Sequence, residues 1–242
     1  MIPAGYLWLF DLDGTLVRTG GAGMQAMEQA FTEVMGWREP LAGISPAGRT
    51  DPSIVHEVSE KQRGRGMSEA EMERVFGRYL ELLEQTLAAA PAFRVLPGIR
   101  EFLEQAQARP DTWLGLGTGN LEFGAQLKLK RGGLDGYFRF GGFGSDAVDR
   151  VDLLRKAVAR GETLRGAPLP PERVIVVGDT PHDVAAGMAI GARTVAVATG
   201  PFTPAQLAAS KAGLVLADFT EQDKLAAWLA GVEGGKYAAG QP

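Results

Sequence analysis

The stretch "YLWLFDLDGTLV" at residues 6–17 decides the fold. It begins with the apolar run Tyr6–Phe10, and a continuous run of this kind is typical of a strand buried on both faces of a sheet. Asp11 and Asp13 follow directly. Parallel sheets bind their ligands beyond the carboxyl ends of the strands, and buried strands do not normally end in paired acids. The stretch therefore indicates a core strand with a functional site at its end.

The same pattern recurs along much of the chain. Short runs rich in Val, Ile, Leu and Trp end in Gly, Thr or Asp, and longer helical stretches separate them. This alternation is typical of a parallel sheet with crossover helices, so we predict a doubly wound, Rossmann-like α/β core. The other expected strands are Trp113–Gly117, Val174–Gly178 and Thr194–Ala198, with shorter ones near Phe138–Phe140 and near Leu214–Leu216.

The region from Gly20 to Phe93 has a different pattern, without a convincing strand. The segment "GMQAMEQAFTEVMG" carries apolar residues at helical spacing. A second helix is expected to open at Asp51, with a proline in its first turn. A third begins at Ser68, where Glu71 completes the spacing of a capping box. We therefore predict an inserted, all-helical segment.

These patterns predict a division into two domains. The α/β core is expected at residues 1–19 and 94–232, and the helical cap domain at residues 20–93. Residues 233–242 are expected to form a flexible tail, because chain ends without apolar anchors fray. The glycine-rich "RTGGAG" at residues 18–23 is a candidate hinge between the two domains.

Composition excludes several kinds of protein. The 242 residues are 45% hydrophobic, which is enough for one large core with a smaller attached domain. A net charge of −4 argues against a nucleic-acid partner and gives no polybasic membrane signal. The absence of cysteine excludes disulfides, thiolate metal sites and cysteine nucleophiles. Without a leader or a membrane-length apolar run, we expect a cytoplasmic location; nothing in the sequence indicates the oligomeric state.

Two further strand ends carry polar residues. One predicted strand ends in "GLGTGN", which places Thr118 and Gly119 at its tip, and another ends in "GDTPHD", which places Asp179 and Asp183 there. Together with the two acids after the first strand, they would bring four carboxylates to one edge of the sheet. Protonation or a bound cation must relieve the repulsion, and oxygen-only ligands favour Mg²⁺.

The same strand ends could hold a phosphoryl group. Thr118 offers a hydroxyl, and the loops at Gly14 and Gly119 can bring main-chain amides close to an anion. A basic side chain, either Lys128 or Arg150, would complete the site. Catalysis of phosphoryl transfer is largely positioning and charge stabilisation, which is what this set of groups can supply.

"DLDGT", Thr118, a downstream basic residue and "GDTPHD" together resemble the haloacid dehalogenase superfamily, in its phosphoglycolate-phosphatase-like branch. The helical segment after the first motif is similar to the cap of that superfamily, so the resemblance covers nearly the whole chain. The dehalogenases of the superfamily lack an acid at the place of Asp13. An alkoxide leaves badly without a proton whereas a halide needs none, so Asp13 indicates phosphate ester chemistry.

The resemblance implies roles for individual residues. Asp11 would be the nucleophile that forms an aspartyl-phosphate, and Asp13 the general acid and then the general base. Mg²⁺ would be held by Asp11, the main-chain carbonyl of Asp13 and Asp179, with Asp183 acting through water. Phosphoryl oxygens would contact the residues at the second strand end, namely Thr118 and the amide of Gly119.

The basic residue departs from the pattern of the superfamily, which usually has a lysine in its third motif. Arg150 stands where that lysine would fall, and Lys128 on the preceding helix is its competitor. We favour Arg150, because arginine keeps its charge and can bind a phosphate with two donors.

The expected function is a Mg²⁺-dependent phosphatase that acts on a small phosphorylated metabolite. A phosphomutase of the same superfamily is an alternative, since the cap decides whether water reaches the second step. A phospho-accepting, receiver-like signalling module is an alternative of another class, because it also gathers acids at parallel strand ends. Cap residues set the leaving group, and the sequence does not identify the substrate.

Overall fold

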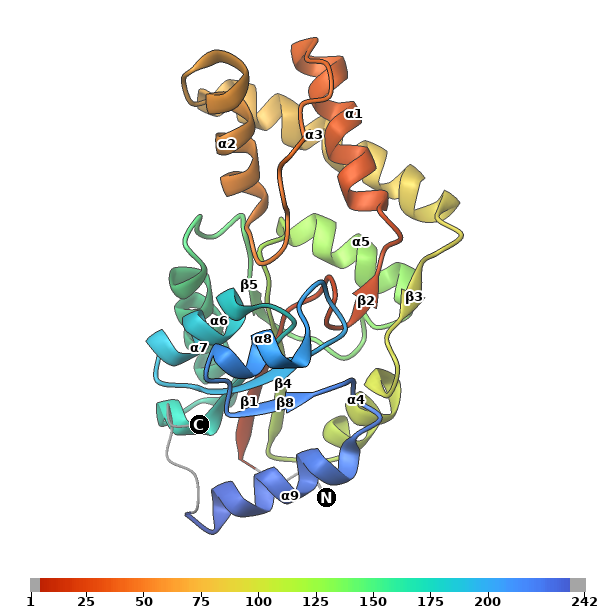
Figure 1. Cartoon of the computed structure of the whole chain (residues 1–242). Helices are drawn as coiled ribbons and strands as arrows, with labels where there is room; N and C mark the ends of the chain where they lie inside the picture. The colour runs from red at the N-terminus through yellow and green to blue at the C-terminus, as the bar shows by residue number, and fades with distance from the viewer. Residues whose placement is uncertain (1–4, 236–242) are drawn as a thin grey trace.

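The computed structural model describes residues 5–235 as a sheet-based core with a group of helices standing over one end of the sheet (Figure 1). Within that range, no helix is both long enough and apolar enough to cross a membrane.

The core is a six-stranded sheet in which every neighbouring pair is parallel. Its order is β5-β4-β1-β6-β7-β8, so β1 lies between β4 and β6 where the direction of winding changes. This topology confirms the doubly wound α/β class, and its crevice lies at the carboxyl end of β1. The strands are β1 Tyr6–Phe10, β4 Thr112–Gly117, β5 Gly141–Gly142, β6 Val174–Gly178, β7 Arg193–Val197 and β8 Leu214–Leu216.

The apolar run of β1 is continuous because both faces of the strand are covered. Trp8 and Phe10 point to one face, where Phe102 lies with its ring centroid 5.0 Å from that of Trp8. Leu7 and Leu9 point to the opposite face and belong to a second apolar cluster. The alternation of side chains along a strand thus places β1 between two layers of helices.

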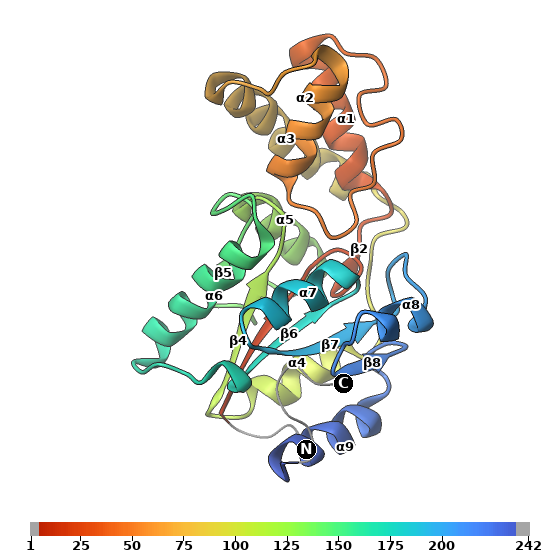
Figure 2. The ribbon, with the colours of Figure 1, turned by 60° about the vertical axis from the view of Figure 1, so that its left-hand side comes forward.

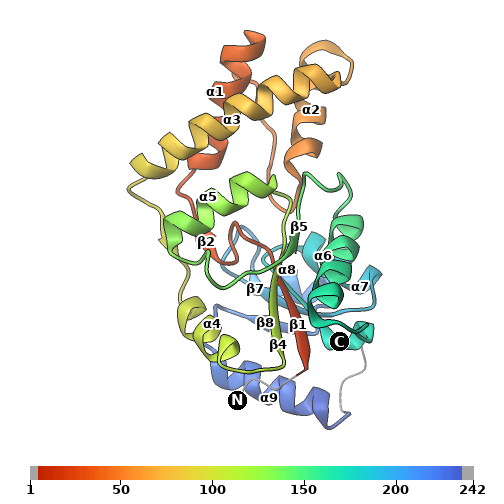
Figure 3. The same cartoon turned by 180° about the vertical axis from the view of Figure 1, so that it is seen from behind.

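Helices cover the two faces of the sheet as Figures 2 and 3 show. The apolar side chains of α4 and α9 pack with Trp8, and those of α6 pack with Leu7. α5 lies between the sheet and the cap helices. The core helices are α4 Ile99–Gln107, α5 Glu122–Gly132, α6 Arg150–Arg165, α7 Pro181–Ala189, α8 Pro204–Ala209 and α9 Gln222–Glu233, and a 3-10 turn, η1, spans Pro171–Arg173.

The short strand expected near Phe138–Phe140 lies directly after that range, because the edge strand β5 spans Gly141–Gly142. A Cβ at Gly142 would lie 1.9 Å from the main-chain oxygen of Leu153 in α6. Only glycine at position 142 therefore allows the strand to lie this close to the helix. Glycine is depleted in strands, which hid β5 in the sequence.

Most of the flexible tail expected at residues 233–242 lies outside the described residues. Glu233 is the last residue of α9, and its carboxylate accepts a hydrogen bond from the hydroxyl of Tyr6 at 2.9 Å.

Three helices form the cap: α1 Ala22–Met35, α2 Asp51–Arg63 and α3 Glu69–Ala89. They share one apolar cluster, which includes Phe31 of α1, Val55 of α2 and Leu83 of α3. The starts of α2 and α3 agree with the sequence signals, since α2 begins at Asp51 with Pro52 in its first turn and the capping box of Ser68 and Glu71 opens α3.

The cap is joined to the core by a two-stranded antiparallel ribbon, which we call the connecting ribbon. It consists of β2 Val17–Arg18 and β3 Arg94–Val95, with Val17 opposite Val95 and Arg18 opposite Arg94. The sequence gives no sign of it, because strands of this length have no periodicity to detect.

Candidate active site

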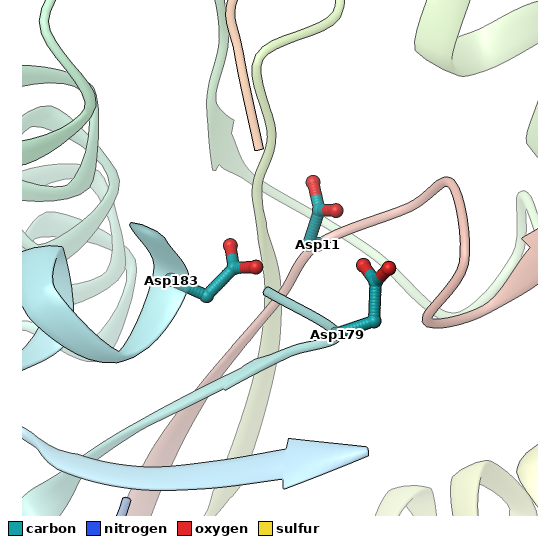
Figure 4. A group of neighbouring side chains, drawn as sticks. All are labelled: Asp11, Asp179 and Asp183. Atoms are coloured by element: carbon teal, nitrogen blue, oxygen red, sulfur yellow. The ribbon is translucent and has the colours of Figure 1, made fainter. Parts of the chain in front are cut away.

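Three carboxylates converge at the carboxyl end of the sheet (Figure 4). Asp11 follows β1, Asp179 follows β6, and Asp183 lies in the first turn of α7. All three are buried, and one carboxylate oxygen from each lies within 4.8 Å of the others. The structure thus brings together acids that are far apart in the sequence, as the strand-end pattern predicts.

Burial and mutual repulsion act against charge on these acids. Burial raises the pKa of Asp179 well above its ordinary value, and the carboxylates of Asp11 and Asp183 raise it further. Burial also raises the pKa of Asp11, although the guanidinium of Arg150 opposes that shift. The cluster therefore needs nearby positive charge if all of its acids are to be ionised.

Arg150 supplies part of that charge. Its Nη2 lies 2.9 Å from Asp11 Oδ1 and also forms an ion pair with Asp183 Oδ1. Arg150 is the first residue of α6, where the side chain of Asp149 caps the helix by accepting from the amides of Val151 and Asp152. The start of α6 therefore fixes the guanidinium beside the predicted nucleophile.

Asp183 is held on both of its oxygens. Oδ2 accepts hydrogen bonds from the main-chain amide and the hydroxyl of Thr180 at 3.0 and 2.7 Å, which completes a capping box at the start of α7. Oδ1 is engaged by Arg150. Asp11 and Asp179 are thus the carboxylates of the cluster that keep an oxygen available for a ligand.

Asp13 lies at the mouth of the site in a separate network. Its side chain is 41% exposed, and its Oδ2 accepts from Lys128 Nζ at 2.5 Å and from Asn120 Nδ2 at 2.9 Å. The same amide group of Asn120 also donates to the hydroxyl of Thr118 at 2.9 Å. Lys128 therefore holds Asp13 whereas Arg150 holds Asp11, so both basic residues contact an acid of the first motif.

Sequence reasoning did not identify Asn120 as part of the site. Its signal is its place, two residues after Thr118 at the tip of β4, where a side chain reaches the same edge as Asp13. Its Oδ1 also accepts from Lys128 Nζ at 2.5 Å, so one amide joins three polar residues.

The turn after β1 fits closely around Asp179. Gly14 has a φ of +84°, and a Cβ on it would lie 2.4 Å from Asp179 Oδ2. The hydroxyl of Thr15 donates to Asp179 Oδ1 at 3.3 Å. The Gly-Thr of "DGT" in the first motif is explained by contacts with Asp179: Gly14 makes room for its carboxylate, and Thr15 orients it.

The cap touches the site through the start of α2. The main-chain amide of Asp51 donates to the carbonyl of Gly119 at 2.8 Å, and the amide of Leu121 donates to Asp51 Oδ2 at 2.9 Å. A Cβ at Gly119 would lie 2.1 Å from the main-chain oxygen of Arg49. Glycine at this position thus allows the cap to meet the loop after β4, and sequence reasoning did not identify Asp51 as part of that contact.

A cavity of about 680 Å³ lies between the cap and the core. Asp11 and Asp179 line it deep in the core and Asp13 lines it at the mouth, while Met24 and Met27 of α1 and Tyr79 of α3 line it from the cap. A site of this size, with apolar walls and a few polar groups, is typical of small-molecule binding.

The donor set fits a hard divalent cation. The oxygens of the cluster are all carboxylate oxygens, and no histidine or cysteine belongs to it. Oxygen ligands of this kind suit Mg²⁺, and a cation would offset the repulsion that raises the pKa of Asp179.

A comparison with protein families gives a match over residues 8–197 to the haloacid dehalogenase-like hydrolases. The chain belongs to this family. The match confirms the resemblance drawn from "DLDGT" and "GDTPHD", and it identifies the protein as an enzyme of a hydrolase family. Membership of that family argues against the receiver-like alternative.

Solved structures share the fold at low sequence identity. A hydrolase from Pseudomonas syringae is 21% identical with a TM-score of 0.72, and the match covers 92% of this chain and 98% of that one. A protein described as a predicted phosphoglycolate phosphatase from Haemophilus somnus is 21% identical, with a TM-score of 0.67 and coverage of 92% and 98%. CbbY from Rhodobacter sphaeroides, solved with phosphate, is 18% identical, with a TM-score of 0.72 and coverage of 94% and 100%. No curated protein matches the sequence.

Proposed function

We propose that this haloacid dehalogenase-like hydrolase is a Mg²⁺-dependent phosphatase that cleaves the phosphate monoester of a small metabolite. The observation that carries the proposal is the arrangement of the two acids of the first motif. Asp11 is buried beside Arg150, whereas Asp13 lies at the cavity mouth, within 2.5 Å of Lys128 Nζ. This arrangement supports Asp11 as the attacking carboxylate and Asp13 as the acid that serves the leaving group.

The reaction that we propose has two steps. In the first, a carboxylate oxygen of Asp11 attacks phosphorus, and the bond between phosphorus and the alcohol oxygen breaks. Asp13 donates a proton to that oxygen, so the alcohol leaves neutral. In the second step, Asp13 takes a proton from water, which attacks the aspartyl-phosphate. Inorganic phosphate is released, and the carboxylate of Asp11 is restored.

The surrounding residues would stabilise the phosphoryl group during both steps. We assign Arg150 to the charge that develops next to Asp11, and Lys128 to the orientation and charge of Asp13. The hydroxyl of Thr118 and the amide of Gly119 would hold phosphoryl oxygens. Preorganised donors and cations of this kind act strongly in a site from which water is largely excluded.

Magnesium fits this site, with Asp11, Asp179 and the main-chain carbonyl of Asp13 as the groups that would hold it. When bound, it would supply positive charge that lessens the repulsion between an anionic nucleophile and an anionic substrate. Asp183, whose oxygens are engaged by Thr180 and Arg150, would act on the ion through water.

The test of this proposal is the hydrolysis of p-nitrophenyl phosphate with Mg²⁺ by the wild type and by Asp11→Asn. An amide is a poor nucleophile, so the variant should fall to the background rate. Asp135→Asn, which alters an exposed acid away from the cavity, is the matched control and should keep activity. Undiminished turnover by Asp11→Asn would remove Asp11 from its role.

Two further measurements refine the proposal. EDTA should abolish the phosphatase activity of the wild type, and added Mg²⁺ should restore that activity. Full activity in EDTA would exclude a metal requirement. Release of inorganic phosphate from a phosphorylated sugar separates a phosphatase from a phosphomutase, which would return the phosphoryl group to the sugar.

A further inference from the structure

The two faces of the connecting ribbon differ in chemistry. Val17 and Val95 pack toward α5, because a Cβ at Gly132 would meet their side chains at 3.5 and 3.3 Å, and Val17 also borders the cavity. Residues next to them in each strand point the other way. Arg18 and Arg94, which are register partners, therefore extend side by side from the opposite face, and both line the cavity above Asp11.

Most of the positive charge around the cavity is already paired. Arg150 contacts Asp11 and Asp183, Lys128 contacts Asp13, and Arg49 contacts Glu57. Within residues 5–235, neither Arg18 nor Arg94 forms an ion pair with a carboxylate, and both are exposed. The connecting ribbon thus carries the cavity-lining cations that have no acidic partner.

Arg18 is nevertheless fixed in place. Its Nε donates to the carbonyl of Thr199 at 3.1 Å, in the loop that follows β7 and continues into the cavity wall at Gly200. A main-chain carbonyl leaves the charge of the guanidinium uncompensated. Like charges at directly opposite positions of an antiparallel pair are destabilising, so this pairing of two arginines carries a local cost.

We propose that Arg18 and Arg94 form a second anion-binding subsite, which receives a carboxylate or a second phosphate at the far end of the substrate. The inference rests on the proposed function, since the first anion is the phosphoryl group next to Asp11. Guanidinium groups bind planar or tetrahedral oxyanions through two donors, and an anion between the two arginines would remove their repulsion.

The size of the cavity agrees with a substrate that carries two anions. A cavity of about 680 Å³ can hold far more than one phosphoryl group, and it extends from Asp179 on the floor to Arg94 at the connecting ribbon. Met24 and Met27 of α1 also line it and offer an apolar wall to the substrate. The substrate class is therefore a short organic phosphate with a second anionic group.

The experiment compares substrates that differ only in the second anion, with release of inorganic phosphate as the readout. One pair is 3-phosphoglycerate and glycerol 3-phosphate, and the other is propane-1,3-diol bisphosphate and its monophosphate. The wild type should prefer the member with two anions by about tenfold or more in kcat/KM, as expected for a charge-assisted hydrogen bond. Arg94→Ala should remove that preference, mainly through KM, and Arg94→Lys should restore part of it.

Arg74→Ala is the matched control, because it removes an exposed arginine of the cap that lies outside the cavity. It should keep the preference for two anions. If p-nitrophenyl phosphate is hydrolysed but neither pair shows a preference, or if Arg94→Ala weakens both members equally, the subsite is refuted while the proposed function stands. An effect of free acetate or sulfate that depends on Arg94, without any preference between paired substrates, would also overturn the assignment to substrate.

The subsite can be judged even if no phosphate is hydrolysed, which would count against the proposed function alone. Calorimetry with the Asp11→Asn variant measures binding without turnover. The compound with two anions should bind about tenfold more tightly than its partner, and Arg94→Ala in that background should abolish the difference. Equal binding of both compounds would refute the subsite.

Discussion

The carboxylate of Asp51 offers a test of how burial and charge balance where the cap meets the core. Asp51 is buried, and burial raises its pKa from the ordinary 3.8 to about 6. Lys128 and the hydrogen bond from Leu121 act in the opposite direction but do not outweigh burial. Lys128 is already paired with Asp13 at 2.5 Å, which limits how far it can lower the pKa of Asp51.

The sign of the effect on stability follows from the direction of the shift. An acid whose pKa is higher in the folded state than in the unfolded state favours folding when protonated, so its contribution is complete below pH 3.8 and is lost as the pH rises through about 6. The difference between the two pKa values corresponds to about 3 kcal/mol, at 1.36 kcal/mol for each pH unit. Asp51→Asn removes the titration and keeps an oxygen that can accept from Leu121.

The assay is urea unfolding of the wild type and of Asp51→Asn between pH 4 and pH 8, followed by tryptophan fluorescence and circular dichroism. The two proteins should have similar free energies of unfolding near pH 4. By pH 8, the free energy of unfolding of the variant should exceed that of the wild type by up to about 3 kcal/mol. Other acids titrate in both proteins, so the difference between the proteins isolates Asp51. A difference that stays constant would refute the reasoning, and a variant that loses ground as the pH rises would show that Lys128 outweighs burial.

Two other substitutions test the packing around the site. Gly119→Ala keeps the main-chain amide but places a methyl group 2.1 Å from the main-chain oxygen of Arg49, so the cap should be pushed from the loop after β4. We expect kcat/KM for p-nitrophenyl phosphate to fall at least tenfold with the core fold intact by circular dichroism; unchanged kinetics would show that this contact does not matter for catalysis. Phe102→Ala removes a buried ring that lies 5.0 Å from both Trp8 and Phe219, and it should lower the free energy of unfolding by about 3–5 kcal/mol in the urea assay. A loss below about 1 kcal/mol would mean that the aromatic cluster repacks around the space.

The sheet was predictable where a strand had an uninterrupted apolar run. Tyr6–Phe10 and Val174–Gly178 match the observed strands residue for residue, because central strands need apolar side chains on both faces. Two of the cap helices were predictable from their starts, since Pro52 lies in the first turn of α2 and Ser68 with Glu71 forms the capping box of α3; α1 was predictable from the helical spacing of its apolar residues. β5 and the connecting ribbon were not, since tertiary contacts hold them and their own sequences carry no strand signal.

The candidate site could be predicted where residues follow a strand directly. Asp11 and Asp179 reach one edge because parallel strands end there, and that follows from topology alone. Asp51 and Asn120 could not be found in this way. Asp51 is brought to the site by docking of the cap, and the role of Asn120 depends on three hydrogen bonds that form only after β1, β4 and α5 are in place.

The connecting ribbon also determines how the fold can diversify. Because Arg18 and Arg94 are partners, the chain leaves the core and returns to it at neighbouring positions, and a longer segment between them adds little to the entropic cost of closing the loop. A short Asn-Gly turn between the same partners would convert the ribbon into an ordinary hairpin. A different helical segment between the same partners would alter which molecules are admitted, provided that it also restores the contact that Asp51 makes with the loop after β4.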